Sequence, residues 1–117
     1  MQIFEERAGG TCIMRLVGEL DEHTAADFRL RADGAIDSGC RHLILVLKDL
    51  RFVDSSGLGV LMGRYRRIVE HGGQVSLVAP PPHIRALLEM AGIPRLMPLY
   101  RSQRQALMGG VRQGGGR

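Results

Sequence analysis

The residue types best suited to chemistry or binding lie at positions 54–59, where the sequence reads DSSGLG. One carboxylate and two hydroxyls, those of Asp54, Ser55 and Ser56, follow a short apolar segment and precede a longer one that begins at Leu58. This order predicts a strand, a turn and then a helix. Such a turn lies at the carboxyl edge of a sheet, where ligands bind in α/β folds, and the free N–H groups of the helix start attract phosphate.

The same side chains have a simpler interpretation as helix caps. Asp54 or either serine, placed before the helix, would stabilise it by about 1 kcal/mol through a hydrogen bond from a free backbone N–H. The local pattern therefore leaves two alternatives open, a cap and a site at which something reacts or docks.

Serine hydrolysis and nucleotide hydrolysis both fit the sequence poorly. A hydrolase nucleophile has one glycine two residues before it and another two residues after it, and neither Ser55 nor Ser56 does. None of the four histidines stands at a spacing that ties it to a serine: they are His23, His42, His71 and His83. The phosphate-loop motif of nucleotide hydrolases is absent, and Lys48 is the only lysine.

Two further groups of residues are of metal-ligating types. Asp21, Glu22 and His23 are adjacent, so their side chains diverge, and a charged helix start explains the acids because the helix dipole favours them. Cys12 and Cys40 have no metal-like spacing and are expected to be buried small hydrophobic residues. The sequence therefore predicts no metal site, and we expect no cofactor.

Gly59 and Gly63 are four residues apart, on a helix face away from the apolar stripe. Each costs about 1 kcal/mol relative to alanine inside a helix, so the pair suggests close approach by another backbone. That backbone belongs either to this domain's own sheet or to a partner. The arginines that follow would either form the rim of a partner surface or be solvated: Arg64, Arg66 and Arg67.

Alternating strand and helix patterns position these residues. Strands are predicted at 11–17, 43–47, 52–53 and 75–79, with a weak edge strand at 96–99. Helices are predicted to follow caps at Asp21 or Thr24, the DSSG turn, Pro82 and the capping-box pair Ser102 and Gln105. The continuous apolar run at 43–47 is typical of a strand covered on both faces. The whole pattern predicts an α/β domain with a largely parallel or mixed sheet.

Length and composition fit one globular domain. The chain has 117 residues, of which 44% are hydrophobic and 24% charged. No apolar run approaches the roughly 20 residues that cross a bilayer. The N-terminus carries acids where a signal peptide carries bases, so a cytoplasmic protein is expected. The Gly- and Arg-rich residues 109–117 are expected to form a flexible tail.

Charge is unevenly distributed along the chain. Residues 1–54 contain 7 bases and 10 acids, whereas residues 55–117 contain 9 bases and 2 acids. A basic half can bind nucleic acid. Here the bases are spread out and only Tyr65 and Tyr100 could stack on nucleobases, so neither nucleic acid nor a membrane is expected as a partner. The basic half is either solvated or faces an acidic protein.

Taken together, these residues resemble a known family. The run DLRFVDSSGLGVLMGRYRRI at 49–68 closely resembles the phosphorylation segment of bacterial anti-sigma factor antagonists, the STAS-domain proteins. Three other segments agree: GELDEHTA at 18–25, RHLILVLKDL at 41–50 and LLEMAGI at 87–93. The resemblance spans roughly residues 3–108 and is greatest to the sporulation branch, which acts in the release of sigma-F.

The resemblance implies a fold and a function. The fold would be the STAS fold, a mixed, mostly parallel β-sheet with about four helices packed mainly on one side, over residues 1–108. Members of this family are not enzymes. Their unphosphorylated form binds an anti-sigma factor that is also a serine kinase, which releases the sigma factor. Phosphorylation inactivates the antagonist, and a serine phosphatase resets it.

The resemblance also assigns roles to individual residues. The phosphate acceptor, directly after the aspartate, falls on Ser55. The surroundings of that phosphosite would be Asp21, Asp54, Ser56, Gly57 and Leu58. The partner-binding residues would be Glu22, Gly59, Met62, Gly63, Arg66 and Arg67. The alternative within the fold is a STAS module that scaffolds a signalling complex or binds a nucleotide, with Ser55 and Ser56 as ligand contacts.

Overall fold

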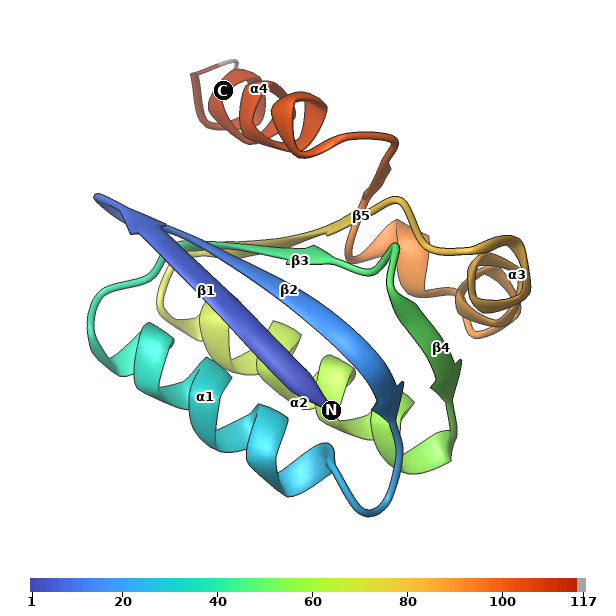
Figure 1. Ribbon diagram of the computed structural model, residues 1–117. Coiled ribbons are helices and arrows are strands. Elements are labelled where there is room, and N and C mark those ends of the chain that lie inside the picture. The colour runs from blue at the N-terminus through green and yellow to red at the C-terminus, as the bar shows by residue number, and fades with distance from the viewer. Residues whose placement is uncertain (116–117) are drawn as a thin grey trace.

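Six strands form one mixed sheet in the computed structural model, which describes residues 1–115 (Figure 1). The order across the sheet is β1-β2-β3-β5-β6, and β4 pairs with β2 outside this path. β1 is antiparallel to β2, and the other pairs are parallel. The strands are β1 (Gln2–Ala8), β2 (Thr11–Leu20), β3 (His42–Val46), β4 (Leu50–Val53), β5 (Gln74–Val78) and β6 (Leu99–Tyr100).

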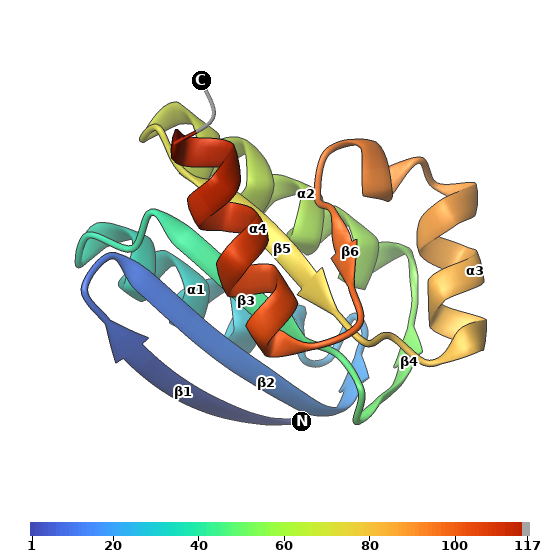
Figure 2. The same cartoon turned by 90° about the horizontal axis from the view of Figure 1, so that it is seen from above.

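Helices cover both faces of the sheet, most of them on one. The α-helices are α1 (Ala25–Asp37), α2 (Ser55–Glu70), α3 (Pro82–Met90) and α4 (Gln103–Gly115), and a 3-10 turn spans Ile93–Arg95. α1 and α2 lie side by side on one face, and α3 contributes Ile84 and Leu88 to the same core (Figure 1). α4 lies across the opposite face, over β3 and β5 (Figure 2). The implied STAS architecture is thereby confirmed.

β3 is the strand that both layers bury. Its side chains alternate between the two cores: Leu43 and Leu45 face α1 and α2, while Ile44 and Val46 pack with Ala106 of α4. A strand covered in this way needs apolar residues at every position, because no side of it meets water. The prediction drawn from its continuous apolar run is confirmed.

β2 links the main sheet to the DSSG turn. Its first half, from Thr11 to Arg15, pairs with β3, and its last residues pair with β4. The register shifts between Gly18 and Glu19, where Gly18 has a φ of 116° and donates its N–H to the carbonyl of Asp49. Glycine adopts this backbone at little cost. The bend lets one long strand deliver Leu20 to the start of α2.

The sequence predicted most elements to within a few residues, but two strands differ. β1 was not predicted, because Gln2–Ala8 is an edge strand whose side chains are all exposed or only half-buried and so carries few apolar residues. The expected strand at 96–99 is only two residues long, Leu99–Tyr100, although it lies at the edge of the sheet as predicted. The start of α3 at Pro82 and the capping pair before α4 are as predicted: Gln105 N–H donates to Ser102 Oγ at 3.1 Å.

The C-terminal segment is helical further along the chain than the sequence predicted. α4 continues to Gly115, so helical backbone covers 109–115, where a flexible tail was expected; residues 116–117 of that expected tail lie outside the described residues. The boundary between the domain and a tail stays a prediction. Among the described residues, no helix combines the length and the apolar character that crossing a bilayer requires. Both cysteines are free and buried, as predicted.

Candidate functional site

Asp54 is the N-cap of α2 and ties two loops together. One carboxylate oxygen accepts a hydrogen bond from the N–H of Gly57 at 2.9 Å, and the other accepts from the N–H of Glu22 at 3.2 Å. Its own N–H donates to the carbonyl of Leu20 at 3.3 Å. The capping interpretation is therefore correct for Asp54, and neither serine acts as the cap of α2.

Gly57 is the point at which α2 presses against the end of β2. A Cβ built there would overlap the carbonyl oxygen of Leu20 and lie 2.9 Å from a methyl carbon of Val53. No larger residue fits without a shift of backbone, because a carbonyl in a strand cannot rotate away. This contact fixes the height of the first turn of α2 above the sheet.

Ser55 and Ser56 occupy the first two positions of α2, and both are exposed. Neither hydroxyl makes a hydrogen bond to any other described residue. The N–H groups at this end of the helix carry the positive end of its dipole. An exposed hydroxyl in such a place is accessible to a modifying enzyme, and a phosphate added to it would lie at a helix start that favours anions.

The loop between β2 and α1 is organised by Asp21. Its carboxylate accepts hydrogen bonds from the N–H groups of His23 at 2.9 Å and Thr24 at 3.2 Å. Thr24 is the N-cap of α1 by position, but its hydroxyl turns back to the carbonyl of Glu19 at 2.8 Å instead of capping the helix. Of the two predicted caps, Thr24 does not cap α1 with its side chain, because its oxygen already accepts the N–H of Asp21 at 3.0 Å. Asp21 instead binds N–H groups of the turn that leads into the helix.

A shallow groove of about 440 Å³ runs between the first turns of α1 and α2. Its lining includes Glu22, Ala25, Ser56 and Gly59. A Cβ added at Gly59 or Gly63 would meet nothing within 4 Å among the described residues. Packing of these glycines onto the domain's own sheet is therefore excluded, and their face of α2 is open.

Arg64 neither forms the rim of an open surface nor is solvated, the two alternatives that the sequence left. Arg64 is only 8% exposed, and its guanidinium pairs with the carboxylate of Asp33 in α1. Burial, and then repulsion by Arg29 and Arg67, lowers the pKa of Arg64. Its position three residues after Leu61 and four before Ile68 places it on the buried stripe, a spacing from which its burial could have been predicted.

The predicted partner-binding side chains of α2 differ in their exposure and in whether they are paired within the domain. Arg66 is exposed, and Met62 is half-buried against the core. Arg67 is held by α1, through Asp33 at 3.1 Å and Asp37 at 2.5 Å. The charge of Arg67 is therefore already used to hold α1 against α2.

Among the described residues, the histidines and acids show no hydrolytic or metal-binding arrangement. His42 is buried and bonded to Ser76 at 2.7 Å, and His71 and His83 contact backbone carbonyls. No histidine hydrogen-bonds to Ser55 or Ser56 within the described residues. In the same part of the chain, no three side chains of metal-ligating type are grouped to hold an ion.

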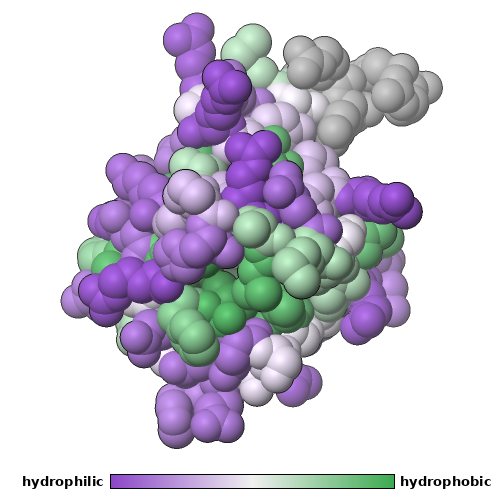
Figure 3. All heavy atoms as spheres, turned by 90° about the vertical axis from the view of Figure 1, so that its right-hand side faces the viewer, coloured by the Kyte–Doolittle hydropathy of each residue, from purple (hydrophilic) through white to green (hydrophobic). Residues whose placement is uncertain are grey.

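An apolar surface borders the start of α2. Figure 3, which faces the right-hand side of Figure 1, shows a continuous apolar area framed by polar side chains. β4 and α3 lie on this side and carry the exposed Phe52, at 48%, and Met90, at 86%. Apolar areas with a polar rim mark interaction surfaces on many proteins.

Comparisons with known proteins agree on one family. The sequence profile of the STAS domain matches residues 4–106. An anti-sigma F factor antagonist of Paenibacillus polymyxa is 44% identical over 92% of this chain and 92% of its own length.

Two solved structures of the anti-sigma factor antagonist SpoIIAA have the same fold. The unphosphorylated form has a TM-score of 0.74 and 27% identity, and covers 95% of this chain and 98% of its own. The phosphorylated form, from Bacillus, has a TM-score of 0.73 and 30% identity, and covers 91% of this chain and 96% of its own.

Proposed function

The chain belongs to the STAS domain family, and we propose that it is an anti-sigma factor antagonist switched off by phosphorylation of Ser55. The observation that carries the proposal is the exposed, unbonded hydroxyl of Ser55 at the first position of α2, beside a carboxylate that alone caps the helix. A relative that has been solved in a phosphorylated form supports it.

The proposed partner is an anti-sigma factor with serine kinase activity. The unphosphorylated protein binds this partner and thereby releases a sigma factor, and a serine phosphatase restores the phosphorylated form to activity. Such a protein binds and regulates, and performs no catalysis of its own, in keeping with relatives that are named as antagonists. A factor that frees sigma acts where transcription takes place, so the proposal places the protein in the cytoplasm.

The proposed docking face is centred on the first turns of α2. Gly59 and Gly63 leave room there for a partner's backbone, and Glu22 and Arg66 provide exposed charges of opposite sign at its borders. Met62 adds apolar area. Arg67 takes part through its exposed fraction while it stays paired to α1.

The switch follows from the charge and size of a phosphate. Phosphorylation of Ser55 adds about −1.5 to −2 charges and three acceptor oxygens. In the free protein the bare helix start tolerates this group, so little refolding is expected. In a docked interface the phosphate must lose water beside Asp54, and a penalty of about 3 kcal/mol weakens binding more than a hundredfold.

The test is phosphorylation by a candidate anti-sigma kinase with ATP, read by intact mass and by fragment spectra. One phosphate on Ser55 is expected, and Ser55→Ala should stay unmodified while it still binds the kinase. Ser56→Ala is the matched control and should be phosphorylated. A phosphate on Ser56 in the unaltered protein, or equal kinase binding by both forms, would refute the switch.

A further inference from the structure

A second hollow, remote in the chain from the DSSG turn, opens at the carboxyl ends of β5 and β6. It measures about 490 Å³, and its lining includes Ala79, Pro80, Arg85, Leu99, Arg101 and Gln105. We call it the basic hollow. The loops that follow parallel strands gather at this edge, which is where α/β folds bind ligands. Its volume is within the range of small-molecule sites.

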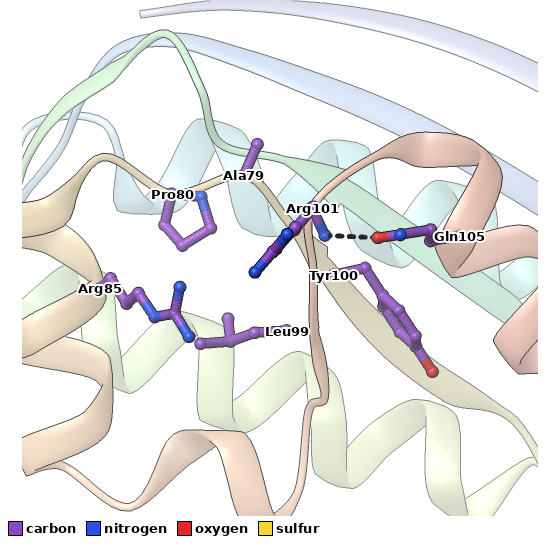
Figure 4. A pocket seen from close by; sticks show the side chains of 7 residues that line it. All are labelled: Ala79, Pro80, Arg85, Leu99, Tyr100, Arg101 and Gln105. Carbon is purple, nitrogen blue, oxygen red and sulfur yellow. Dashed lines mark hydrogen bonds between the residues drawn. The ribbon is translucent and has the colours of Figure 1, made fainter.

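Two guanidinium groups face the same space in the basic hollow. Figure 4 shows Arg85 of α3 and Arg101 of the loop before α4 directed toward each other across Pro80 and Leu99. No carboxylate is among the described side chains that line it. Two like charges that converge without an acid between them repel, and an anion placed between them removes that repulsion.

Neither arginine is strongly engaged elsewhere. Arg85 pairs with Glu89 at 3.4 Å, but both side chains are more than half exposed, so the pair holds Arg85 weakly. Arg101 makes no ion pair with another described residue. Its backbone N–H donates to the side-chain oxygen of Gln105, and its guanidinium makes no hydrogen bond to another described residue. Both can therefore turn toward a ligand at little cost.

Further basic side chains line a second hollow that adjoins the basic hollow at Arg101. This adjoining hollow of about 390 Å³ shares Ala79 and Arg101 with the first and adds Arg15 and Lys48 to its lining. Arg15 is paired with Asp49 at 3.0 Å, whereas Lys48 is exposed and makes no ion pair with a described residue. A ligand with more than one anionic group would find cations on both sides of Arg101.

The backbone at the centre of both hollows is strained. Ala79 has a φ of 54°, the only positive φ among the described residues other than glycine. Its N–H is held by the carbonyl of Tyr100 at 2.8 Å. Strain of this kind costs about 1–3 kcal/mol and is found where a fold keeps a site in shape.

We propose that the basic hollow binds a phosphate-bearing small molecule, which Arg85 and Arg101 hold between them. Guanidinium groups bind phosphate oxygens in pairs of parallel hydrogen bonds, so two of them converging suit a phosphoryl group better than a single carboxylate. The site uses α3, β6, the loop after β5 and the start of α4. It contains none of the residues assigned to the Ser55 switch, so it is independent of the proposed function.

Binding is tested by calorimetry and by backbone amide NMR on the intact chain, with inorganic phosphate, pyrophosphate and ATP as probes. We expect saturable binding with shifts at Ala79, Arg85, Arg101 and Gln105. Arg85→Gln with Arg101→Gln should weaken it about tenfold or more, whereas Arg51→Gln, an exposed arginine outside the hollow, should not.

The probes separate the sources of the phosphate. Tighter binding of ATP or pyrophosphate than of inorganic phosphate identifies an organic or condensed phosphate, and equal binding identifies free phosphate. Hexaglutamate binding without phosphate binding would instead mean an acidic protein surface, and would overturn the proposal. An equal loss in Arg51→Gln, or no shift at the four amides with any probe, would overturn it too. Circular dichroism checks that the double variant is folded.

Discussion

The carboxylate of Asp54 accepts a hydrogen bond from the backbone N–H of Glu22 at 3.2 Å, although 32 positions separate the two residues in the sequence. The same side chain caps α2 through Gly57. One residue therefore fixes both the start of the helix and the loop that borders its exposed serines. The groove between α1 and α2 depends on this link, because Glu22 and Ser56 line it from opposite sides.

Asp54→Ala should lower the free energy of unfolding by about 1–2 kcal/mol, since it leaves the N–H of Gly57 without its cap and frees the loop at Glu22. Urea unfolding measures the loss. Ser56→Ala removes an exposed hydroxyl from the same turn and should stay within about 0.5 kcal/mol of the unaltered protein. An equal loss in both variants would mean that the cap contributes nothing specific.

Alanine at two glycines of α2 should have opposite effects. Gly57→Ala should destabilise the protein by more than about 2 kcal/mol, because its methyl group would overlap the carbonyl of Leu20. Gly59→Ala should stabilise it by up to about 1 kcal/mol, since nothing lies near the new methyl group and alanine favours the helix. Thermal or urea unfolding measures both. Destabilisation by Gly59→Ala would show that this face is packed internally.

Asp33→Ala should cost about 2–3 kcal/mol of stability, because it leaves the buried guanidinium of Arg64 without a counter-charge. Adding Arg64→Met to this variant should recover part of the loss. Asp37→Ala is the control: the side chain of this acid is 61% exposed and, among the described residues, pairs only with Arg67, so its removal should cost less than about 1 kcal/mol. A double-mutant cycle by urea unfolding gives the coupling, and a cycle that sums to zero would contradict the pairing.

Stability should fall as pH is lowered below about 6.5, the ordinary pKa of histidine in an unfolded chain. Burial lowers the pKa of His42, so the unfolded state takes up this proton first. The contribution is therefore complete above the unfolded pKa and is lost as pH falls through the folded one. His42→Gln should flatten the dependence of Tm on pH between about 7.5 and 5.5, and the exposed His23→Gln should not. An unchanged slope in His42→Gln would assign the effect to other groups.

Much of the fold could be predicted from short-range patterns. The apolar run at 43–47 predicted a strand buried on both faces, and the DSSG turn, the start of α3 at Pro82 and the Ser102–Gln105 pair predicted helix boundaries. These signals succeed because a cap, a turn or a period involves residues within a few positions of one another. β1 was not predicted, because an edge strand with no buried side chain needs few apolar residues.

The strand, turn and helix around the candidate site were predicted, but the arrangement of its side chains was not. The sequence by itself determined that a carboxylate and two hydroxyls lie at the start of one helix, and that two glycines follow on a single face of it. Only the tertiary structure decided that Asp54 is the cap, that Gly59 and Gly63 face outward, and that Arg64 is buried against Asp33. Likewise, only the fold brings Arg85 and Arg101 to one hollow. The pairing of Arg64 with Asp33 and the meeting of Arg85 with Arg101 depend on contacts between residues far apart in the chain, and such contacts leave no period or spacing in the sequence. The choice of Asp54 as the cap is local, but the two neighbouring serines suit a cap equally well by residue type.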